Sequence, residues 1–163
     1  NINLSIIHST IKGLVEEHVN DIEVFECSSD FSDTETFCKE YNFLLEDSCN
    51  AILIKSKKPE EFYSMFCVLG GDMLDVNRKA KDAMGAKRVS FASKEEAEEA
   101  TKQIYGGISP LGLNENINIY IDQNVMSREK VFIGGGNRTT KLFLSPHTLQ
   151  KISKGIVLDL AQS

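Results

Sequence analysis

Tyr-Gly-Gly-Ile-Ser-Pro-Leu-Gly, residues 105–112, holds three of the eleven glycines and one of the three prolines of this chain. Glycine permits backbone conformations with φ > 0 and lets a ligand approach the amides closely. Pro110 fixes its own φ and favours an extended conformation at Ser109. Such a segment can point several N–H groups into one concavity, which suits a carboxylate, a phosphate or a polarised carbonyl oxygen. The alternative is an ordinary connection between a helix and a strand.

The bulk composition is that of a globular domain. The chain has 163 residues, of which 41% are hydrophobic and 26% are charged, so we expect one domain over residues 1–163. No apolar run approaches the roughly 18 residues that a membrane helix needs. The first residues do not combine a basic start with an apolar core, as a secretion signal would. We therefore expect a cytoplasmic protein that makes no use of a membrane.

The cysteines and histidines do not have the spacing of a metal site. Cys27, Cys38, Cys49 and Cys67 contain no C-x-x-C pair, and the chain has only three histidines. We expect reduced, mostly buried thiols, no metal and no cofactor. Cys49 or Cys67 as a nucleophile remains an alternative, although neither has a histidine near it in the sequence.

The net charge of −6 is unevenly distributed. Residues 1–50 hold eleven acidic and two basic side chains, whereas residues 55–88 hold eight basic and five acidic ones. A protein that grips long nucleic acid through many phosphates is usually basic overall. Any contact with nucleic acid should therefore be short and should involve the middle of the chain, where Arg78 and Lys79 belong to a basic cluster. A solvated helix face is the other interpretation of that cluster.

Hydrophobic periodicity and capping signals predict an α+β domain. Apolar spacing predicts a helix over 2–18, Asp33 or Thr34 should cap a second helix, and Ser93 with Glu96 forms a capping box. Helices and strands do not alternate regularly, so a curved, mixed or mostly antiparallel, barrel-like sheet flanked by helices fits best. The predicted strands lie at 22–26, 51–54, 65–69, 89–92, 117–122, 131–133, 141–144 and 156–158, and the remaining helices at 75–84, from 93 and from 145.

Five ordered blocks give the chain a resemblance to a known family. They are Leu74–Asn77, Ala83–Lys87, Gly106–Gly112, Ile119–Asp122 and the stretch from Gly134-Gly135-Gly136 to Leu144-Ser145-Pro146. In order and spacing these blocks resemble the YbaK/EbsC family of aminoacyl-tRNA deacylases, which is related to the editing domain of bacterial prolyl-tRNA synthetases. The resemblance covers roughly residues 33–150.

The resemblance implies a role for each block. It implies that Gly106 to Pro110 lines a pocket for the aminoacyl group at the tRNA 3′ end, with Ser109 and Pro110 binding substrate. The amides of Gly106, Gly107 and Ile108 could then stabilise the developing oxyanion. Asp122 would bind the α-amino group or order a water. Its alternative is a carboxylate at a strand end that is satisfied by nearby amides.

One position departs from the family pattern. Many members have a lysine just before the strand that here is 51–54, and alignment by that strand places Asn50 there. An amide can donate a hydrogen bond but brings no positive charge. Lys55 lies five residues further along, on the opposite face of a regular strand, and it replaces the family lysine only if the strand is irregular or the alignment is shifted. The resemblance nevertheless makes Asn50 a candidate catalytic residue.

Together these observations leave three functional interpretations. The first is a free-standing hydrolase that cleaves the ester of a mischarged aminoacyl-tRNA in trans, with tRNA-Pro as the implied type. Arg78 and Lys79 would then contact the tRNA, and an aminoacyl-tRNA synthetase is a possible second partner. The second is a catalytically weak or inactive module that binds the aminoacyl-tRNA or amino acid. The third is a hydrolase of a small ester or amide.

Overall fold

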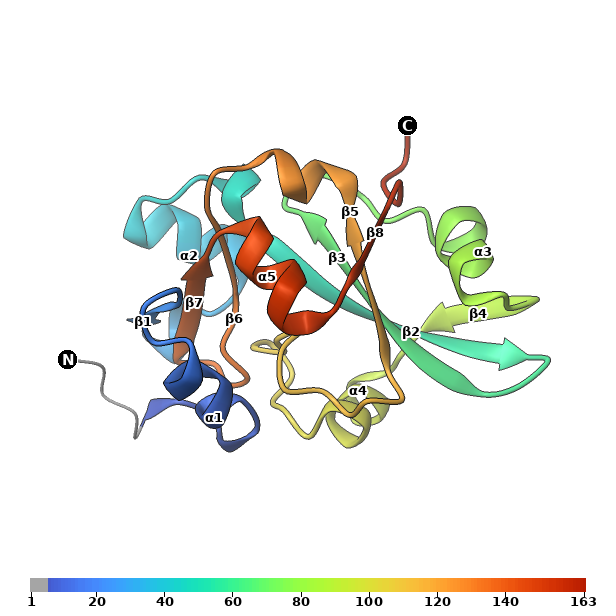
Figure 1. Ribbon diagram of the computed structural model, residues 1–163, viewed down its shortest axis with the longest axis horizontal. Coiled ribbons are helices and arrows are strands. Elements are labelled where there is room, and N and C mark those ends of the chain that lie inside the picture. The colour runs from blue at the N-terminus through green and yellow to red at the C-terminus, as the bar shows by residue number, and fades with distance from the viewer. Residues whose placement is uncertain (1–5) are drawn as a thin grey trace.

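Two sheets form the framework of the protein. The computed structural model describes residues 6–163. Its larger sheet has five strands in the order β4-β2-β3-β5-β8, and its smaller sheet has three in the order β1-β7-β6. Figure 1 shows the small sheet at one end of the molecule and the long β2–β3 hairpin extending toward the other.

The β2–β3 hairpin is the longest element of the larger sheet. Strands β2 (Cys49–Lys58) and β3 (Phe62–Leu69) pair antiparallel from Cys49 opposite Leu69 to Ser56 opposite Phe62. Strand β4 (Arg88–Phe91) adds antiparallel to β2, while β5 (Asn118–Asp122) and β8 (Ile156–Leu158) continue the sheet in parallel pairs. The sheet is therefore mixed, as the irregular order of predicted elements indicated.

The small sheet pairs a strand from the first part of the chain with two strands from its last part. Strand β1 (Glu23–Glu26) pairs antiparallel with β7 (Thr140–Leu144), which also pairs with β6 (Val131–Gly134). A parallel bridge between Ser48 and Phe132 links this sheet to the start of β2. One apolar cluster contains side chains from both sheets, including Cys67, Ile121 and Leu142. The sheets therefore share a core, and within residues 6–163 neither closes into a barrel.

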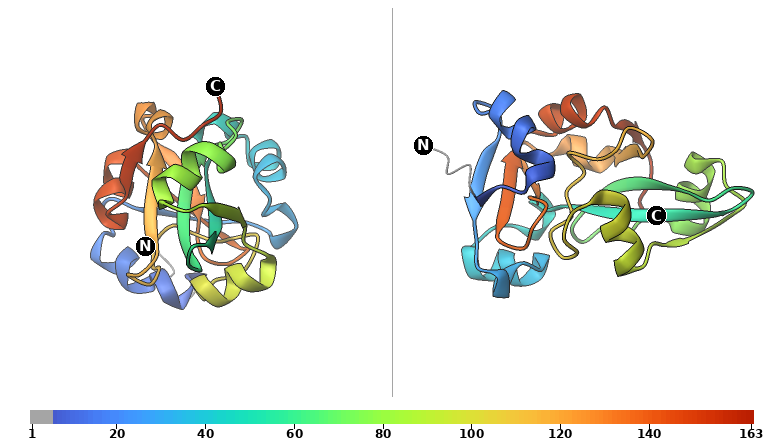
Figure 2. Two further views of the ribbon diagram at one scale, coloured as in Figure 1. Left: turned by 90° about the vertical axis from the view of Figure 1, so that its right-hand side faces the viewer. Right: turned by 90° about the horizontal axis from the view of Figure 1, so that it is seen from below.

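Helices pack against the apolar faces of the two sheets. Helix α1 (Ser9–Glu17) and α5 (Pro146–Ser153) pack on the shared core, and α2 (Thr34–Tyr41) packs on the small sheet through Phe37. Helix α4 (Lys94–Thr101) covers β2 and β3 through Ala97, and α3 (Lys81–Met84) lies beside β4. Figure 2 shows α3 and α4 on opposite faces of the hairpin.

Most predicted elements are confirmed, and the differences have physical causes. The predicted capping box of Ser93 and Glu96 is present, and Gly85 ends α3 with φ 64°. Strand β2 continues to Lys58 because it pairs with β3 on one side and β4 on the other. The helix predicted over 75–84 begins as a π-turn, Val76–Ala80.

Turns of 3-10 helix connect some of these elements. Short 3-10 turns lie at Ser29–Phe31, Leu45–Asp47 and Gln123–Ser127 (η5). The part of the predicted first helix that precedes residue 6 lies outside the described residues. No helix within residues 6–163 is long and apolar enough to cross a bilayer.

Candidate active site

The glycine-proline loop opens into a pocket where the two sheets meet. The pocket has a volume of about 320 Å³, at the lower end of the range for small-ligand sites. Three segments distant in sequence enclose it: the turn before α2, the start of β2, and the loop between α4 and β5. The strands of the small sheet close it from the side. Its lining residues are Ser32, Asp33, Thr34, Cys49, Asn50, Ala51, Tyr105, Gly106, Gly107, Ile108, Gly134 and Lys141.

Close backbone packing holds the loop against the small sheet. A Cβ atom on Gly107 would overlap the carbonyl oxygen of Asn137, and one on Gly134 would meet the carbonyl oxygens of Gly107 and Ile108. The Gly136 amide donates to the Gly107 carbonyl at 2.6 Å. Of the neighbours Gly106 and Gly107, Gly106 is the one with a positive φ, +94°, which is the left-handed conformation that favours glycine. Gly107 is thus required for close contact rather than for positive φ.

Some backbone amides of the loop donate hydrogen bonds within the protein, and others do not. Gly107 N donates to the Ile104 carbonyl at 3.0 Å, and Ser109 N donates to Gln103 Oε1 at 2.6 Å. The amides of Gly106 and Ile108 have no acceptor within residues 6–163. Free amides beside a pocket can bind a carbonyl oxygen or an oxyanion. The donors left for a ligand are therefore those of Gly106 and Ile108.

Gln103, which the sequence analysis did not identify, holds the loop in place through two hydrogen bonds of its side chain. Its side chain is 2% exposed, accepts from Ser109 N and donates to the Leu111 carbonyl at 2.8 Å. Ser109 and Pro110, predicted to bind substrate, are themselves buried and do not line this pocket. The Ser109 hydroxyl accepts from Leu111 N at 3.1 Å, an internal loop contact. Their direct contact with substrate stays a prediction.

Asn50 lines the same pocket as the loop, and its catalytic role stays a prediction. Its Oδ1 accepts hydrogen bonds from the hydroxyls of Thr34 at 3.1 Å and Ser48 at 3.0 Å. These two bonds orient the amide, so that Nδ2 carries the hydrogens that are left for a ligand. Within residues 6–163, Nδ2 has no acceptor. Lys55, by contrast, lines a different cavity, where Glu96 and Glu61 pair with its ammonium at 2.6 and 3.2 Å.

Asp33 places a carboxylate at the pocket rim. It caps α2 by accepting from Thr36 N at 3.3 Å. Hydrogen bonds from the Thr36 hydroxyl and amide hold the pKa of Asp33 below its usual range. A carboxylate that holds its proton so weakly is a poor general base near neutral pH but a good partner for a cation.

Lys141 is a charged pocket residue that the sequence analysis did not single out. It sits in β7 opposite Gly134, is 7% exposed, and donates to the Ser32 carbonyl at 2.8 Å. Its ammonium also lies 5.4 Å from the centre of the Phe37 ring. The available signal was a lysine in an otherwise apolar strand segment, Lys-Leu-Phe-Leu, on the same side as Phe143.

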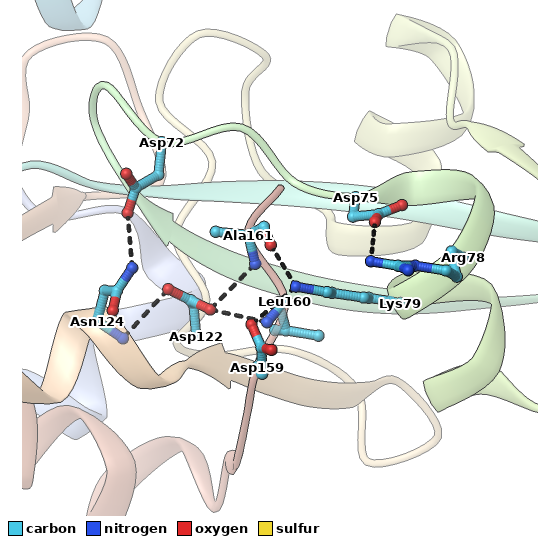
Figure 3. Close-up of polar contacts among 9 residues, drawn as sticks. All are labelled: Asp72, Asp75, Arg78, Lys79, Asp122, Asn124, Asp159, Leu160 and Ala161. Atoms are coloured by element: carbon cyan, nitrogen blue, oxygen red, sulfur yellow. Dashed lines mark hydrogen bonds and ion pairs between the residues drawn. The ribbon is translucent and has the colours of Figure 1, made fainter. Parts of the chain in front are cut away.

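Asp122 lies elsewhere, in the parallel part of the larger sheet. Its fully buried carboxylate accepts from Leu160 N at 2.8 Å, Ala161 N at 3.2 Å and Asn124 N at 3.1 Å, as Figure 3 shows. These bonds cap η5 and tie the C-terminal segment to β5. Asp122 is not among the residues that line the pocket. A role in substrate binding stays a prediction, and the observed contacts match the structural alternative.

Arg78 and Lys79 lie near that same C-terminal segment (Figure 3). Lys79 donates to Asp159 at 3.0 Å and to the Ala161 carbonyl at 2.6 Å, and its side chain is only 15% exposed. Arg78 pairs with Asp75 at 3.3 Å but keeps 67% of its side chain exposed. Arg78 is therefore the residue of the two that is free to reach a phosphate. Neither residue lines the pocket.

Metal-ligand geometry is absent from the described part of the chain. Within residues 6–163 no group of three His, Cys, Asp or Glu side chains could hold a metal ion. All four cysteines are free and buried, and Cys49 touches the pocket. A neighbouring thiol, Cys67, and burial raise the pKa of Cys49 well above its usual value, which disfavours a thiolate nucleophile.

A comparison with protein families decides the classification. The model of the family described as "Aminoacyl-tRNA editing domain" matches residues 28–152, which include every residue that lines the pocket. The chain belongs to this aminoacyl-tRNA editing domain family. The resemblance found in the sequence is therefore confirmed.

Two named proteins are similar to parts of this chain. The chain is 26% identical over 133 residues to the proline–tRNA ligase of Brachyspira hyodysenteriae, covering 82% of this chain and 21% of the ligase. It is 27% identical over 86 residues to EbsC of Enterococcus faecalis, whose name describes a candidate Cys-tRNA(Pro)/Cys-tRNA(Cys) deacylase. That match covers 53% of this chain and 52% of EbsC. The matched regions thus span about half of EbsC and a fifth of the ligase.

A solved structure shares the editing-domain fold. A crystal structure described as a candidate trans-editing enzyme for prolyl tRNA synthetase superposes with a TM-score of 0.82 over 94% of this chain and 96% of its own. Sequence identity is 21%, so the likeness concerns the fold.

Proposed function

We propose that this chain hydrolyses the ester bond of a mischarged aminoacyl-tRNA, acting in trans on the charged 3′ end, with tRNA-Pro as the expected type. The observation that carries the proposal is the pocket itself. Gly106 and Ile108, whose backbone amides have no acceptor within residues 6–163, line it together with the oriented side-chain amide of Asn50. The family to which the chain belongs and the names of its relatives support the substrate class.

Hydrolysis needs few catalytic groups from the protein, because an aminoacyl ester is already activated. Water attacks the ester carbonyl carbon, the bond from that carbon to the ribose oxygen breaks, and the products are a free amino acid and the terminal hydroxyl of the tRNA. Negative charge develops on the carbonyl oxygen during the attack. Amides of Gly106 and Ile108 directed at that oxygen would each contribute about 3 kcal/mol of transition-state stabilisation.

The remaining pocket residues would position the substrate. The Asp33 carboxylate is suited to the cationic α-amino group, because its pKa is held below the usual range. Asn50 Nδ2 can donate to the ester or to the terminal ribose. With Asp33 engaged by the α-amino group, the proton that the attacking water loses is transferred to the leaving ribose oxygen, either through solvent or through the neighbouring ribose hydroxyl.

The weak basicity of Asp33 favours a second candidate function, a module that binds the aminoacyl group without cleaving it. Asn50 is neutral, and Asp33 is a poor proton acceptor at neutral pH. Such a module would keep the pocket geometry and its affinity. Its binding site would be the one already described.

A deacylation panel separates the two candidates. tRNA-Pro charged in turn with different amino acids is incubated with the protein, and release of the amino acid is followed by acid precipitation. In parallel, calorimetry measures binding of 3′-aminoacylamino-3′-deoxyadenosines, in which an amide replaces the labile ester. Turnover of at least one mischarged tRNA above the spontaneous rate supports the hydrolase. Binding of the amides with every ester left intact would overturn it in favour of the binding module.

A further inference from the structure

The pocket contains a buried cation that the proposed hydrolysis does not use. Lys141 lines it from β7 with 7% of its surface exposed. Among the described residues, its one hydrogen-bond acceptor is the Ser32 carbonyl, at 2.8 Å. An ammonium has three N–H donors, so donors remain for a ligand. Within residues 6–163 no carboxylate lies within 4 Å of the Lys141 ammonium.

Other sheltered lysines of the chain are paired with acids. Lys55, whose side chain is 20% exposed, pairs with Glu61 and Glu96, and Lys79, at 15%, pairs with Asp159. A buried charge without a counter-ion is costly, and it persists where another group compensates it. The ring of Phe37 at 5.4 Å offers part of that compensation. A full counter-charge is absent from the described chain.

The surroundings of Lys141 also lower the pKa of its ammonium. Burial is the main cause, and the nearby Cys27, Cys38 and Asp33 oppose it. An anion bound in the pocket would reverse this effect, because an opposite charge favours the protonated form. Since no carboxylate of residues 6–163 lies within 4 Å of the ammonium, an anion in the pocket would add the direct counter-charge that Asp33 supplies only from a distance.

Two opposite charges line the pocket, and they lie close enough for each to shift the pKa of the other. Asp33, exposed at the rim, attracts a cation, and Lys141, buried beneath Ser32, attracts an anion. An aminoacyl group carries its cation on the α-amino nitrogen, which suits the rim. The group that extends from the same carbon into the pocket is the side chain. A side chain that ends in a carboxylate would supply the missing counter-charge.

We propose that Lys141 is a specificity-determining residue that selects aminoacyl groups with an acidic side chain, aspartyl or glutamyl, over neutral ones of similar size. This inference rests on the proposed function in one respect, namely that the ligand is an aminoacyl group at the 3′ end of a tRNA. A charge-assisted hydrogen bond in a sheltered site corresponds to a preference of about 10- to 100-fold.

Two substitutions of Lys141 separate its charge from its structural bond. Lys141→Gln removes the charge but keeps an N–H donor for the Ser32 carbonyl, whereas Lys141→Met removes both. Lys151→Gln is the matched control, because it deletes one exposed positive charge on α5, outside the pocket. Circular dichroism and thermal melts establish which variants are folded.

The binding experiment uses the non-hydrolysable aspartyl, asparaginyl and alanyl 3′-amino-3′-deoxyadenosine amides. Calorimetry should show the parent protein and Lys151→Gln binding the aspartyl amide about 10- to 100-fold tighter than the other two. Lys141→Gln should lose this preference while its affinity for the alanyl amide stays within about threefold. Equal affinities in the parent, or a uniform loss in Lys141→Gln, would overturn the inference.

Deacylation of tRNA charged with the same three amino acids keeps the two proposals distinguishable. A parent that prefers the aspartyl amide but cleaves no ester overturns the proposed hydrolysis and supports the role of Lys141. A parent that cleaves alanyl and aspartyl esters equally, with equal affinities for the amides, supports hydrolysis and overturns the role of Lys141.

Discussion

Replacing Asn50 tests both the architecture of the pocket and its chemistry. Asn50→Ala removes the acceptor of two hydroxyls, those of Thr34 and Ser48, and Ser48 is 2% exposed. At 0.5–1.5 kcal/mol for each hydrogen bond, the free energy of unfolding should fall by about 1–3 kcal/mol. The same change removes the Nδ2 donor. The loss of one hydrogen bond to substrate corresponds to a decrease in kcat/KM of about 2- to 10-fold.

Asn50→Asp separates these two effects. The carboxylate has the same shape and keeps an acceptor for both hydroxyls, so stability should stay within about 1 kcal/mol of the parent. It has no donor, however, and it brings negative charge to the place where the transition state develops its own. The decrease in kcat/KM should therefore exceed 10-fold, although this variant is the more stable of the two.

Urea unfolding gives the stabilities, and single-turnover deacylation of mischarged tRNA-Pro gives the rates. Asn116→Ala is the matched control, because it truncates an exposed asparagine that lines the separate cavity around Lys55. It should leave both quantities unchanged. Asn50→Asp with parental kcat/KM would show that the Nδ2 donor is not used. Loss of activity in proportion to stability in both variants would reduce Asn50 to a structural residue.

Four further outcomes follow from the same contacts. Gly107→Ala should lower stability by about 2–3 kcal/mol and abolish turnover, because its Cβ would overlap a facing carbonyl oxygen; urea unfolding and deacylation measure both. Asp122→Asn should lower stability by about 1–3 kcal/mol and leave kcat/KM per folded molecule unchanged, since its carboxylate serves three backbone amides. Arg78→Ala should reduce the salt dependence of log Kd for tRNA by about one unit of slope and spare hydrolysis of a minimal aminoacyl ester. Hydrogen bonds from Lys55 and from the Ser93 amide lower the pKa of Glu96 to about 2, so the stability advantage of the parent over Glu96→Gln should be complete above about pH 4.5 and vanish as the pH falls toward 2.

Each of these outcomes has a result that contradicts it. Gly13→Ala, at a helix position with open space around the new Cβ, should be stabilising, and a Gly107→Ala variant that behaves like it would remove the close-packing argument. A drop in kcat/KM of the fully folded Asp122→Asn protein would restore Asp122 to the substrate site. Equal losses on tRNA and on the minimal ester would mean that Arg78 acts through folding. A pH-independent difference for Glu96→Gln would show that its carboxylate is not stabilised in the folded state.

The sequence alone was sufficient for the ends of several helices, because the signals involved act over a few residues. The box of Ser93 and Glu96 starts α4, Ser145 and Pro146 start α5, and the left-handed Gly85 ends α3. Ordered blocks such as Gly106–Gly112 also identified the family, because the backbone of its fold requires such residues at fixed spacings along the chain.

Only the tertiary structure decided which side chains share the pocket and what each loop residue does. Gly107 must be glycine because a carbonyl thirty residues later, on Asn137, occupies the place of its Cβ. Asp122 follows the loop in sequence, yet the parallel pairing of β5 with β8 delivers it to the amides of the C-terminal segment. The pocket that lacks a lysine at position 50 receives one from β7, ninety-one residues further along the chain. Such contacts depend on how two sheets pack, and no local pattern of residues encodes that packing.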